Sequence, residues 1–148
     1  MVLNKLEQAW AAFLESFAGL STEQLQQPGV VGDWSVKDIV AHVTWWEEEA
    51  LIHLPVILKG GQPPRYSTLY GSIDAFNAQM TEQKRTLSLA EVLMQSDETH
   101  SRLLAYVQSI PEKHMTSETR FRRRLRLDTY SHYPIHAQEI QHWRERSG

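Results

Sequence analysis

Two histidines near the end of the chain, His132 and His136, are four residues apart. In an α-helix this spacing places their Cβ atoms about 5–6 Å apart on one face. Two imidazoles in that arrangement can chelate one divalent metal ion. The pair alone is weak evidence for a metal site, because the chain has seven histidines and the spacing arises readily by chance.

A third histidine, His42, is a further candidate ligand. In a helix it shares a face with Asp38 and Trp46 and points away from the charged face predicted at Glu47 and Glu48. The alternative is a histidine at the edge of the core whose ring is hydrogen-bonded to a carbonyl. Three imidazoles from two helices would leave open positions on a zinc or nickel ion, which is typical of catalytic metal sites.

The chain contains no cysteine, which narrows the chemistry further. Disulfides, thiolate zinc sites, iron–sulfur clusters and a cysteine nucleophile are all excluded. Any metal site in this chain must therefore consist of nitrogen and oxygen ligands.

Two carboxylates are predicted to lie near such an ion. Glu49 follows His42 by two turns on roughly the same face, and Asp128 precedes His132 by one turn. Either can act as a general base or can orient an imidazole through its free N–H, although a solvated surface acid is an equally good interpretation of both. The candidates for the wall of a substrate pocket are Trp46, Asn77, Tyr130 and Tyr133.

The periodicity of apolar residues predicts helices as the elements that position these side chains. Ser35 with Asp38 and Ser88 with Glu91 have the spacing of helix capping boxes. The predicted helices cover residues 3–17, 35 to a point between 53 and 59, 72–84, 88–110 and 127–146.

The segment 115–126 is the least helical part of the sequence. Its residues Phe121, Arg123 and Leu125 are predicted to alternate as a short extended segment. Four or five helices without convincing strand pairs predict an all-α fold, a four-helix bundle with an extra short helix or irregular connections. Bundles place ligand and metal sites in the core, on side chains from facing helices.

Pro134 lies inside the last predicted helix. A proline there removes one backbone hydrogen bond and bends the helix, at a cost of about 3 kcal/mol if nothing compensates. We therefore expect Pro134 to tilt His132 relative to His136.

The length of 148 residues predicts a single domain spanning residues 1–148. The chain is 41% hydrophobic and 22% charged, which excludes a disordered or collagen-like protein. The net charge is −3, and five arginines within 120–126 contribute +5, so the rest of the chain carries −8. We interpret this cluster as a solvated connection, or alternatively as a site for the carboxylates of an acidic co-substrate.

The N-terminal residues do not have the pattern of a signal peptide. The most apolar segment, 51–58, is interrupted by His53 and Pro55 and is far shorter than the roughly 20 residues of a membrane span. We therefore expect a cytoplasmic protein without a membrane partner. His53, His100 and His114 are predicted to lie at the surface, and His142 falls off the face of the two C-terminal histidines.

Two segments resemble a known family. Trp34-Ser-Val-Lys-Asp-Ile-Val-Ala-His42 and Tyr130-Ser-His132-Tyr-Pro-Ile-His136 are similar to the helix-two and C-terminal signatures of the DinB/YfiT-like superfamily of metal-binding four-helix bundles. The pairs Trp45-Trp46 and Phe76-Asn77 are most similar to its ClbS/DfsB-type branch. The resemblance implies His42, His132 and His136 as ligands of a divalent ion, usually zinc or nickel.

The resemblance also implies a function. It favours a metal-dependent enzyme, either a hydrolase or a transferase of small thiols, whose partners are a small-molecule substrate and a low-molecular-weight thiol. The alternative is a non-catalytic protein of the same fold that binds and sequesters a small molecule. A nucleic-acid partner is the least favoured reading because most of the chain is acidic. The sequence leaves the oligomeric state open, with a homodimer as one alternative because exposed bundle faces often pair.

Overall fold

The computed structural model describes residues 1–147. In chain order its elements are α1 (Val2–Ser16), α2 (Thr22–Leu25), α3 (Val36–Leu58), α4 (Tyr66–Tyr70), α5 (Ile73–Lys84), α6 (Leu89–Ser109), the 3-10 helix η1 (Glu112–His114), α7 (Arg120–Asp128) and α8 (Tyr133–Ser147). Within these residues there is no β-strand, only one isolated bridge between Val31 and Trp34.

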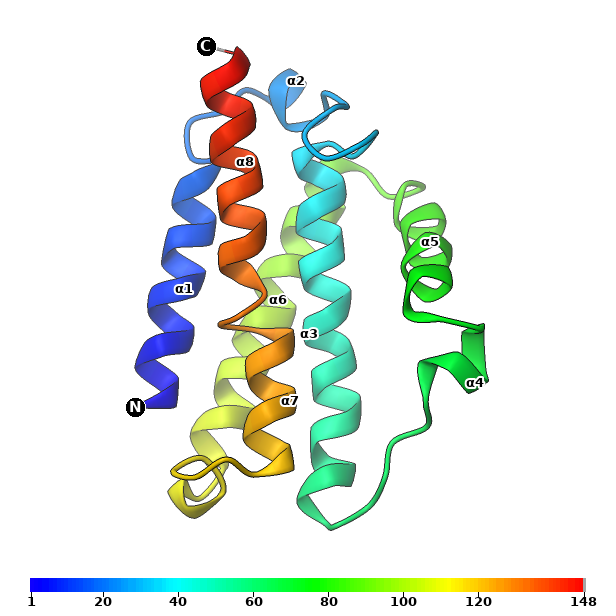
Figure 1. The fold of residues 1–148 in the computed structure, drawn as a ribbon. Helices are drawn as coiled ribbons and strands as arrows, with labels where there is room; N and C mark the ends of the chain where they lie inside the picture. Colours follow the sequence, from blue (N-terminus) through cyan, green and yellow to red (C-terminus); the bar gives the residue numbers. More distant parts are fainter. Residues whose placement is uncertain (148) are drawn as a thin grey trace.

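Four columns of helix form a bundle (Figure 1). Three columns are α1, α3 and α6, and the fourth consists of α7 and α8 placed end to end. Helix α3 contacts α6, α7 and α5, while α1 packs against α8 and α6. The fully buried apolar residues between them include Leu6, Phe13, Ile39, Leu54, Leu103, Leu125 and Ile140. The predicted all-α four-helix bundle with extra short helices is confirmed.

Both predicted capping boxes are present. The Ser35 hydroxyl accepts the N–H of Asp38 at 3.1 Å, and the Asp38 carboxylate accepts the N–H of Ser35 at 2.9 Å. Ser88 and Glu91 make the same reciprocal pair at the start of α6. Each box satisfies two of the backbone N–H groups that a helix start leaves unpaired.

Helix α3 extends to Leu58, within the predicted range, with Pro55 in its last turn. Within residues 1–147, neither α3 nor any other helix is long and apolar enough to cross a membrane.

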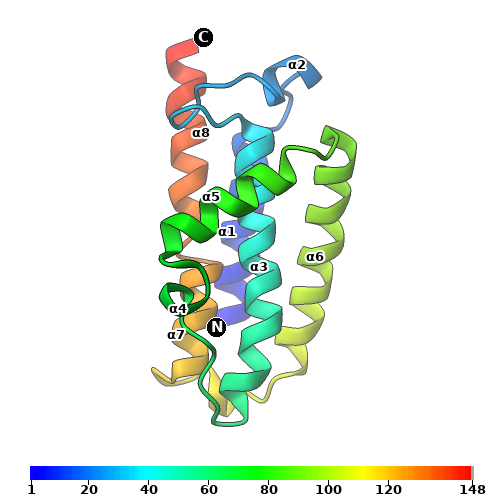
Figure 2. The same cartoon turned by 90° about the vertical axis from the view of Figure 1, so that its right-hand side faces the viewer.

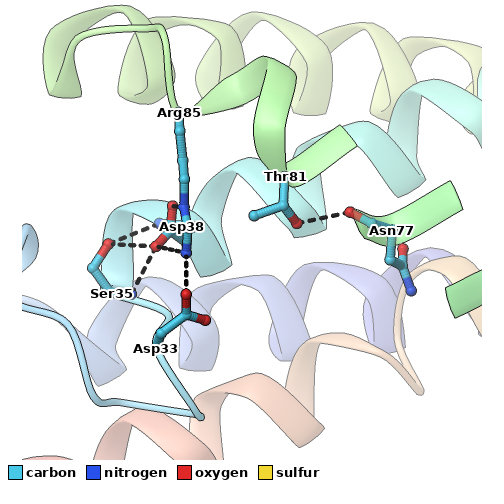
Figure 3. Close-up of polar contacts among 6 residues, drawn as sticks. All are labelled: Asp33, Ser35, Asp38, Asn77, Thr81 and Arg85. Carbon is cyan, nitrogen blue, oxygen red and sulfur yellow. Dashed lines mark hydrogen bonds and ion pairs between the residues drawn. The ribbon is translucent and has the colours of Figure 1, made fainter. Parts of the chain in front are cut away.

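Helix α5 lies across one side of α3 (Figure 2) and is tied to the beginning of that helix. Arg85, at the end of α5, pairs with Asp33 at 3.2 Å and with Asp38 at 3.3 Å (Figure 3). Earlier in α5, the Thr81 hydroxyl donates to the carbonyl oxygen of Asn77 at 2.7 Å. The Arg85 pairs tie the end of α5 to the start of α3, whereas the Thr81 bond lies within α5.

The predicted extended segment is wrong, because α7 occupies Arg120–Asp128. The Thr119 hydroxyl caps this helix by accepting the N–H of Arg122 at 3.0 Å. Phe121 and Leu125 are four residues apart and both are buried, so the spacing that fits a strand fits one face of a helix as well. Arginine is also a good helix former, which favours the helix where the periodicity is ambiguous.

The last predicted helix is divided in two. Residues 129–132 form a turn, in which the N–H groups of His132 and Tyr133 both donate to the carbonyl oxygen of Thr129 at 2.8 Å. Pro134 is therefore the second residue of α8, where a backbone N–H has no partner within the helix in any case. The expectation of a proline bend inside a continuous helix is wrong.

Candidate metal centre

Three imidazoles meet between α3 and the junction of α7 with α8. His42 comes from α3, His132 from the turn before α8, and His136 from the first turns of α8. The Nε2 atom of His132 lies 3.1 Å from Nε2 of His42 and 3.0 Å from Nε2 of His136. One ligand atom from each ring lies within 4.8 Å of the other two. We call these three residues the histidine triad.

The spacing within the histidine triad fits a divalent ion. Two imidazole nitrogens bound to zinc at 2.0–2.1 Å with a tetrahedral angle are about 3.3 Å apart, close to the distances around His132 Nε2. The set has only nitrogen donors, which suits zinc and nickel. Three ligands leave a tetrahedral ion at least one open position.

The Nδ1 atoms of the three rings differ in their hydrogen-bond partners. His136 Nδ1 lies 2.6 Å from Oε1 of Glu139, one turn later in α8, a contact that orients the ring and leaves Nε2 facing its neighbours. The Nδ1 atoms of His42 and His132 are buried and have no hydrogen-bond partner among residues 1–147. The ring of His42 is held instead by packing against Trp34 and Trp45, with centroids 4.9 and 4.8 Å away.

Burial keeps the histidine triad neutral. It lowers the pKa of His42 from 6.5 to about 2, of His132 to about 3 and of His136 to about 4, with repulsion between the rings adding to the effect on His42 and His132. A neutral imidazole presents a lone pair, which is the form that binds a metal ion. All three rings are therefore ready to coordinate at neutral pH.

A pocket of about 370 Å³ opens beside the histidine triad. Of the residues predicted near the site, His42, His132, Trp46, Asn77 and Asp128 line it. The Trp46 indole N–H donates to Oδ1 of Asn77 at 3.0 Å, which joins α3 to α5 across the pocket wall. The lining residues that sequence analysis did not identify are Tyr66, Ile73, Arg124 and Leu127.

Asp128 and Glu49 belong to one hydrogen-bonded chain. Arg124 donates from Nε to Oδ2 of Asp128 at 2.6 Å and from a terminal nitrogen to the Tyr66 hydroxyl at 2.8 Å. That hydroxyl in turn donates to Oε1 of Glu49 at 3.0 Å, and His53 lies 3.4 Å from the same oxygen. Burial raises the pKa of the Asp128 carboxyl to about 6, against the opposing effect of Arg124. Glu49 does not line the pocket and reaches it only through Tyr66.

The two candidate tyrosines lie outside the pocket lining. Tyr133 is fully buried, and its hydroxyl donates to Oε2 of Glu47 at 2.5 Å. Tyr130 is half-buried, and its hydroxyl has no hydrogen-bond partner among residues 1–147. Both are consistent with the core-edge role that is the commoner one for tyrosine.

A buried polar cluster lies behind the histidine triad and was not predicted. Glu47 has 0% exposure and His100 has 5%, and His100 Nδ1 is 2.6 Å from Oε2 of Glu47. Together with Tyr133 these residues form what we call the Glu47 cluster. The expectations of a solvent-facing Glu47 and a surface His100 are wrong, and so is that of a surface His53, which is 8% exposed.

A signal for the Glu47 cluster was present in the sequence. Val40, Val43, Glu47, Ala50 and Leu54 follow one another at steps of three and four, so the carboxylate occupies a position in the apolar stripe of α3. The run Glu47–Glu49 hid this signal, because three consecutive acids suggest a solvated face.

The arginine cluster is part of α7 and most of its members are committed to partners. Arg124 turns inward to Asp128, Arg126 pairs with Glu118 at 3.0 Å, and Arg120 donates to the carbonyl oxygen of Gly61. Arg122 is half-buried and Arg123 is exposed. The description of this segment as a solvated connection is therefore wrong for Arg124, which lines the pocket.

The sequence profile of the DinB superfamily matches residues 5–144 of the chain. The chain belongs to the DinB superfamily. A comparison with curated protein sequences finds no match. The superfamily resemblance indicated by the histidine segments is thus confirmed over nearly the whole length.

Solved structures of the DinB fold resemble this one at 14% sequence identity. DfsB, described as a sibling lethal factor precursor, has a TM-score of 0.80 and aligns over 98% of this chain and 94% of its own. The colibactin self-resistance protein ClbS, in complex with double-stranded DNA, has a TM-score of 0.77 over 93% and 90%. A protein from Streptococcus pneumoniae has 0.79 over 97% and 88%. The likeness to ClbS and DfsB, the proteins after which the expected branch is called, shows that they share this fold.

One expectation about partners is wrong. The acidic character of the chain led us to favour a protein without a nucleic-acid partner, but ClbS, which has this fold, is in complex with double-stranded DNA. Net charge is a property of the whole surface, whereas nucleic-acid contacts depend on the charges of one face. The net charge of −3 therefore gives no ground for that exclusion.

Proposed function

We propose that this protein is a metal-dependent enzyme, a hydrolase or a small-thiol transferase, with His42, His132 and His136 as the ligands of a zinc or nickel ion. The position of His132 Nε2, 3.1 Å from Nε2 of His42 and 3.0 Å from Nε2 of His136, supports the proposal. His42 and His132 are 90 residues apart in the chain, yet the ligand atoms of the three histidines are turned toward one another, with His42 and His136 buried and His132 half-buried.

The ion would act as a Lewis acid and would activate a hydrolytic or a thiol nucleophile. The residues of the chain bind the substrate and move the proton. Trp46, Ile73 and Leu127 provide apolar walls for the body of a small molecule. Asn77 receives the Trp46 N–H on its oxygen, so its amide nitrogen is the donor for a polar group of the substrate.

Asp128 is the proposed general base. Its carboxyl lines the pocket, and a pKa of about 6 lies close to the pH at which a base works best. Arg124 holds Oδ2 at 2.6 Å, so Oδ1 is the oxygen that would accept a proton from the nucleophile. Glu49, linked to Arg124 through Tyr66, would position the guanidinium and not touch the substrate.

Metal analysis of protein purified without a histidine tag tests the proposal. We expect about one zinc or nickel ion per chain, and we expect the His136→Ala variant to lose it. His142→Ala is the matched control, because His142 lies on the same helix but is exposed. Metal content that is equal in the two variants would refute the site.

The Asp128→Asn variant then separates metal binding from catalysis. It keeps the size of the side chain but removes the base, so we expect the metal content to stay near one per chain. The rate of the metal-dependent reaction should fall by about 10²–10⁴-fold, the usual contribution of a general base. An unchanged rate would assign the proton transfer to another group.

A further inference from the structure

Tyr133 joins the Glu47 cluster to the histidine triad. It lies between His132 and His136 in the sequence, and its side chain points away from the pocket into the core. Its hydroxyl donates to Glu47 at 2.5 Å, and Glu47 lies on α3, as does His42. A hydrogen bond thus connects the two elements that carry the ligands.

The junction of α7 and α8 needs such a connection. His132 and His136 do not lie on one continuous helix, because the chain turns at residues 129–132 and Thr129 leaves the helical region with φ −131° and ψ −97°. His132 immediately precedes α8, at the position whose carbonyl accepts the first hydrogen bond of a helix, so the helical ladder joins it to α8 only at its edge and the turn sets the direction of its side chain. A contact that holds Tyr133 holds both ligands, since His132 directly precedes it and His136 follows it by three residues in α8.

Glu47 is itself held from several sides. His100 of α6 lies 2.6 Å from the same carboxylate oxygen, and Trp10 of α1 stacks on the His100 ring at 3.8 Å with an interplanar angle of 8°. With Tyr133 of α8, each of the four columns of the bundle contributes one residue. The carboxylate that receives the Tyr133 hydroxyl is consequently fixed by the whole bundle.

The composition of the Glu47 cluster is unfavourable for stability alone. Burying a carboxylate is costly, and apolar residues of similar volume often stabilise a core as well or better. The Oε1 atom of Glu47 and the Nε2 atom of His100 are also buried without a partner among residues 1–147. Apolar packing has no direction, however, whereas a hydrogen bond between Tyr133 and Glu47 sets the position of one atom relative to another.

We propose that Glu47 is a positioning residue that, through Tyr133, holds the turn between α7 and α8 so that His132 and His136 meet His42. This inference rests on the proposed metal site for its consequence, but the positional effect itself can be measured without metal.

Hydrogen exchange of the metal-free protein tests the positional effect. In Tyr133→Phe we expect the amides of His132 and Tyr133, which donate to Thr129, to exchange at least about tenfold faster, while α1 is unchanged. Tyr106→Phe is the matched control, because its hydroxyl is buried but has no partner among residues 1–147, so exchange should match the wild type. Equal protection of this turn in Tyr133→Phe and the wild type would overturn the inference.

Zinc titration tests the consequence. The affinity should fall by about 10–100-fold in Tyr133→Phe and in Glu47→Leu. Glu47→Gln keeps an oxygen for the Tyr133 hydroxyl and should stay within about threefold of the wild type. If Glu47 only stabilised the fold, the zinc affinity of each variant would change in step with its thermal stability. A zinc affinity reduced as much in Glu47→Gln as in Glu47→Leu would therefore contradict the inference.

The two experiments distinguish this inference from the proposed function. If the wild type binds no zinc or nickel but Tyr133→Phe loosens the turn, the metal proposal fails and the positioning role stands. If the wild type binds one ion and Tyr133→Phe alters neither exchange nor affinity, the positioning role fails and the metal proposal stands. Should Glu47→Leu not fold, the Tyr133→Phe variant alone decides.

Discussion

The histidine triad and the Glu47 cluster are both buried sets of polar side chains, yet their internal contacts differ. In the Glu47 cluster an imidazole and a phenol both face a carboxylate, so donors and acceptor are present together. In the histidine triad three imidazoles face one another, and burial lowers the pKa of each. In one set donors face an acceptor, whereas in the other three ring nitrogens are turned toward one another beside an open pocket.

This difference separates a structural device from a binding site. A set of side chains that pairs within itself can be replaced as a unit, because no group is left unpaired when all members are exchanged. A set of imidazole nitrogens that can all present lone pairs to one point gains most from a cation that fills it. The contacts of a buried histidine therefore say more about its role than its burial does.

Removing one member of the Glu47 cluster should have the largest effect. Glu47→Ala leaves His100 and Tyr133 buried without their acceptor, so we expect the free energy of unfolding to fall by about 3–5 kcal/mol, measured by urea denaturation. The triple variant Glu47→Leu, His100→Leu and Tyr133→Phe leaves none of these groups unpaired and should recover most of this loss. A triple variant as unstable as Glu47→Ala would show that the two sets do not differ in this way.

Removing the Glu139 carboxylate, which contacts His136, should have the next largest effect. Glu139→Ala removes the partner of His136 Nδ1, and we expect the zinc affinity to fall by about 10–100-fold because the ring loses its orientation. The partly exposed Glu139 contributes little to the core, so the thermal midpoint should change by only a few degrees. Isothermal titration with zinc measures the first quantity, and an unchanged affinity would mean that packing alone orients the ring.

Acid should destabilise the metal-free histidine triad. The pKa of the His132 imidazole is lowered to about 3 in the folded protein, so between pH 6.5 and about 3 the unfolded state binds more protons and stability falls as the pH falls. One such group contributes up to about 1.4 kcal/mol per pH unit. Between pH 6 and 5, the free energy of unfolding of His132→Gln, measured by urea denaturation, should depend on pH less steeply than that of the wild type, by about 1 kcal/mol per pH unit. An equally steep dependence would place the acid sensitivity outside the histidine triad.

Replacing Pro134 should have the smallest effect on stability, and the sign of the change shows whether the proline lies inside a helix or at its start. Inside a helix its replacement by alanine would stabilise the protein by about 3 kcal/mol. At the second position of α8 no hydrogen bond is missing, and Pro134→Ala should instead lower the free energy of unfolding by about 0.4–1 kcal/mol, because the unfolded chain becomes more flexible. A gain in stability in urea denaturation would show that the turn before α8 is strained.

The bundle could be predicted from the sequence because its signals are local. Apolar periodicity and the Ser35 and Ser88 capping boxes lie within single helices, and the structure contains them where they were expected. Helix α7 was missed for a local reason as well, since Phe121 and Leu125 fit either periodicity. The division of the last helix was missed because a Thr-Tyr-Ser-His turn carries no glycine to mark it.

The site could be predicted only in part, because its contacts join residues far apart in the chain. The resemblance of two sequence segments to the DinB-like superfamily identified His42, His132 and His136 as ligands of one ion, so their convergence was expected. No sequence signal pairs Glu47 with His100 at a separation of 53 residues. The pocket residues Tyr66 and Arg124 were missed for the same reason, since a hydrogen bond across 58 residues is a property of the fold alone.

The turn at residues 129–132 places the two C-terminal ligands on different kinds of backbone. Within one helix, the helical repeat alone would fix the spacing of the two histidines. Here the direction of His132 depends on the turn, while His136 belongs to the helix that packs against α1. Substitutions confined to that turn offer a way to retune which ion the protein accepts while the scaffold stays the same.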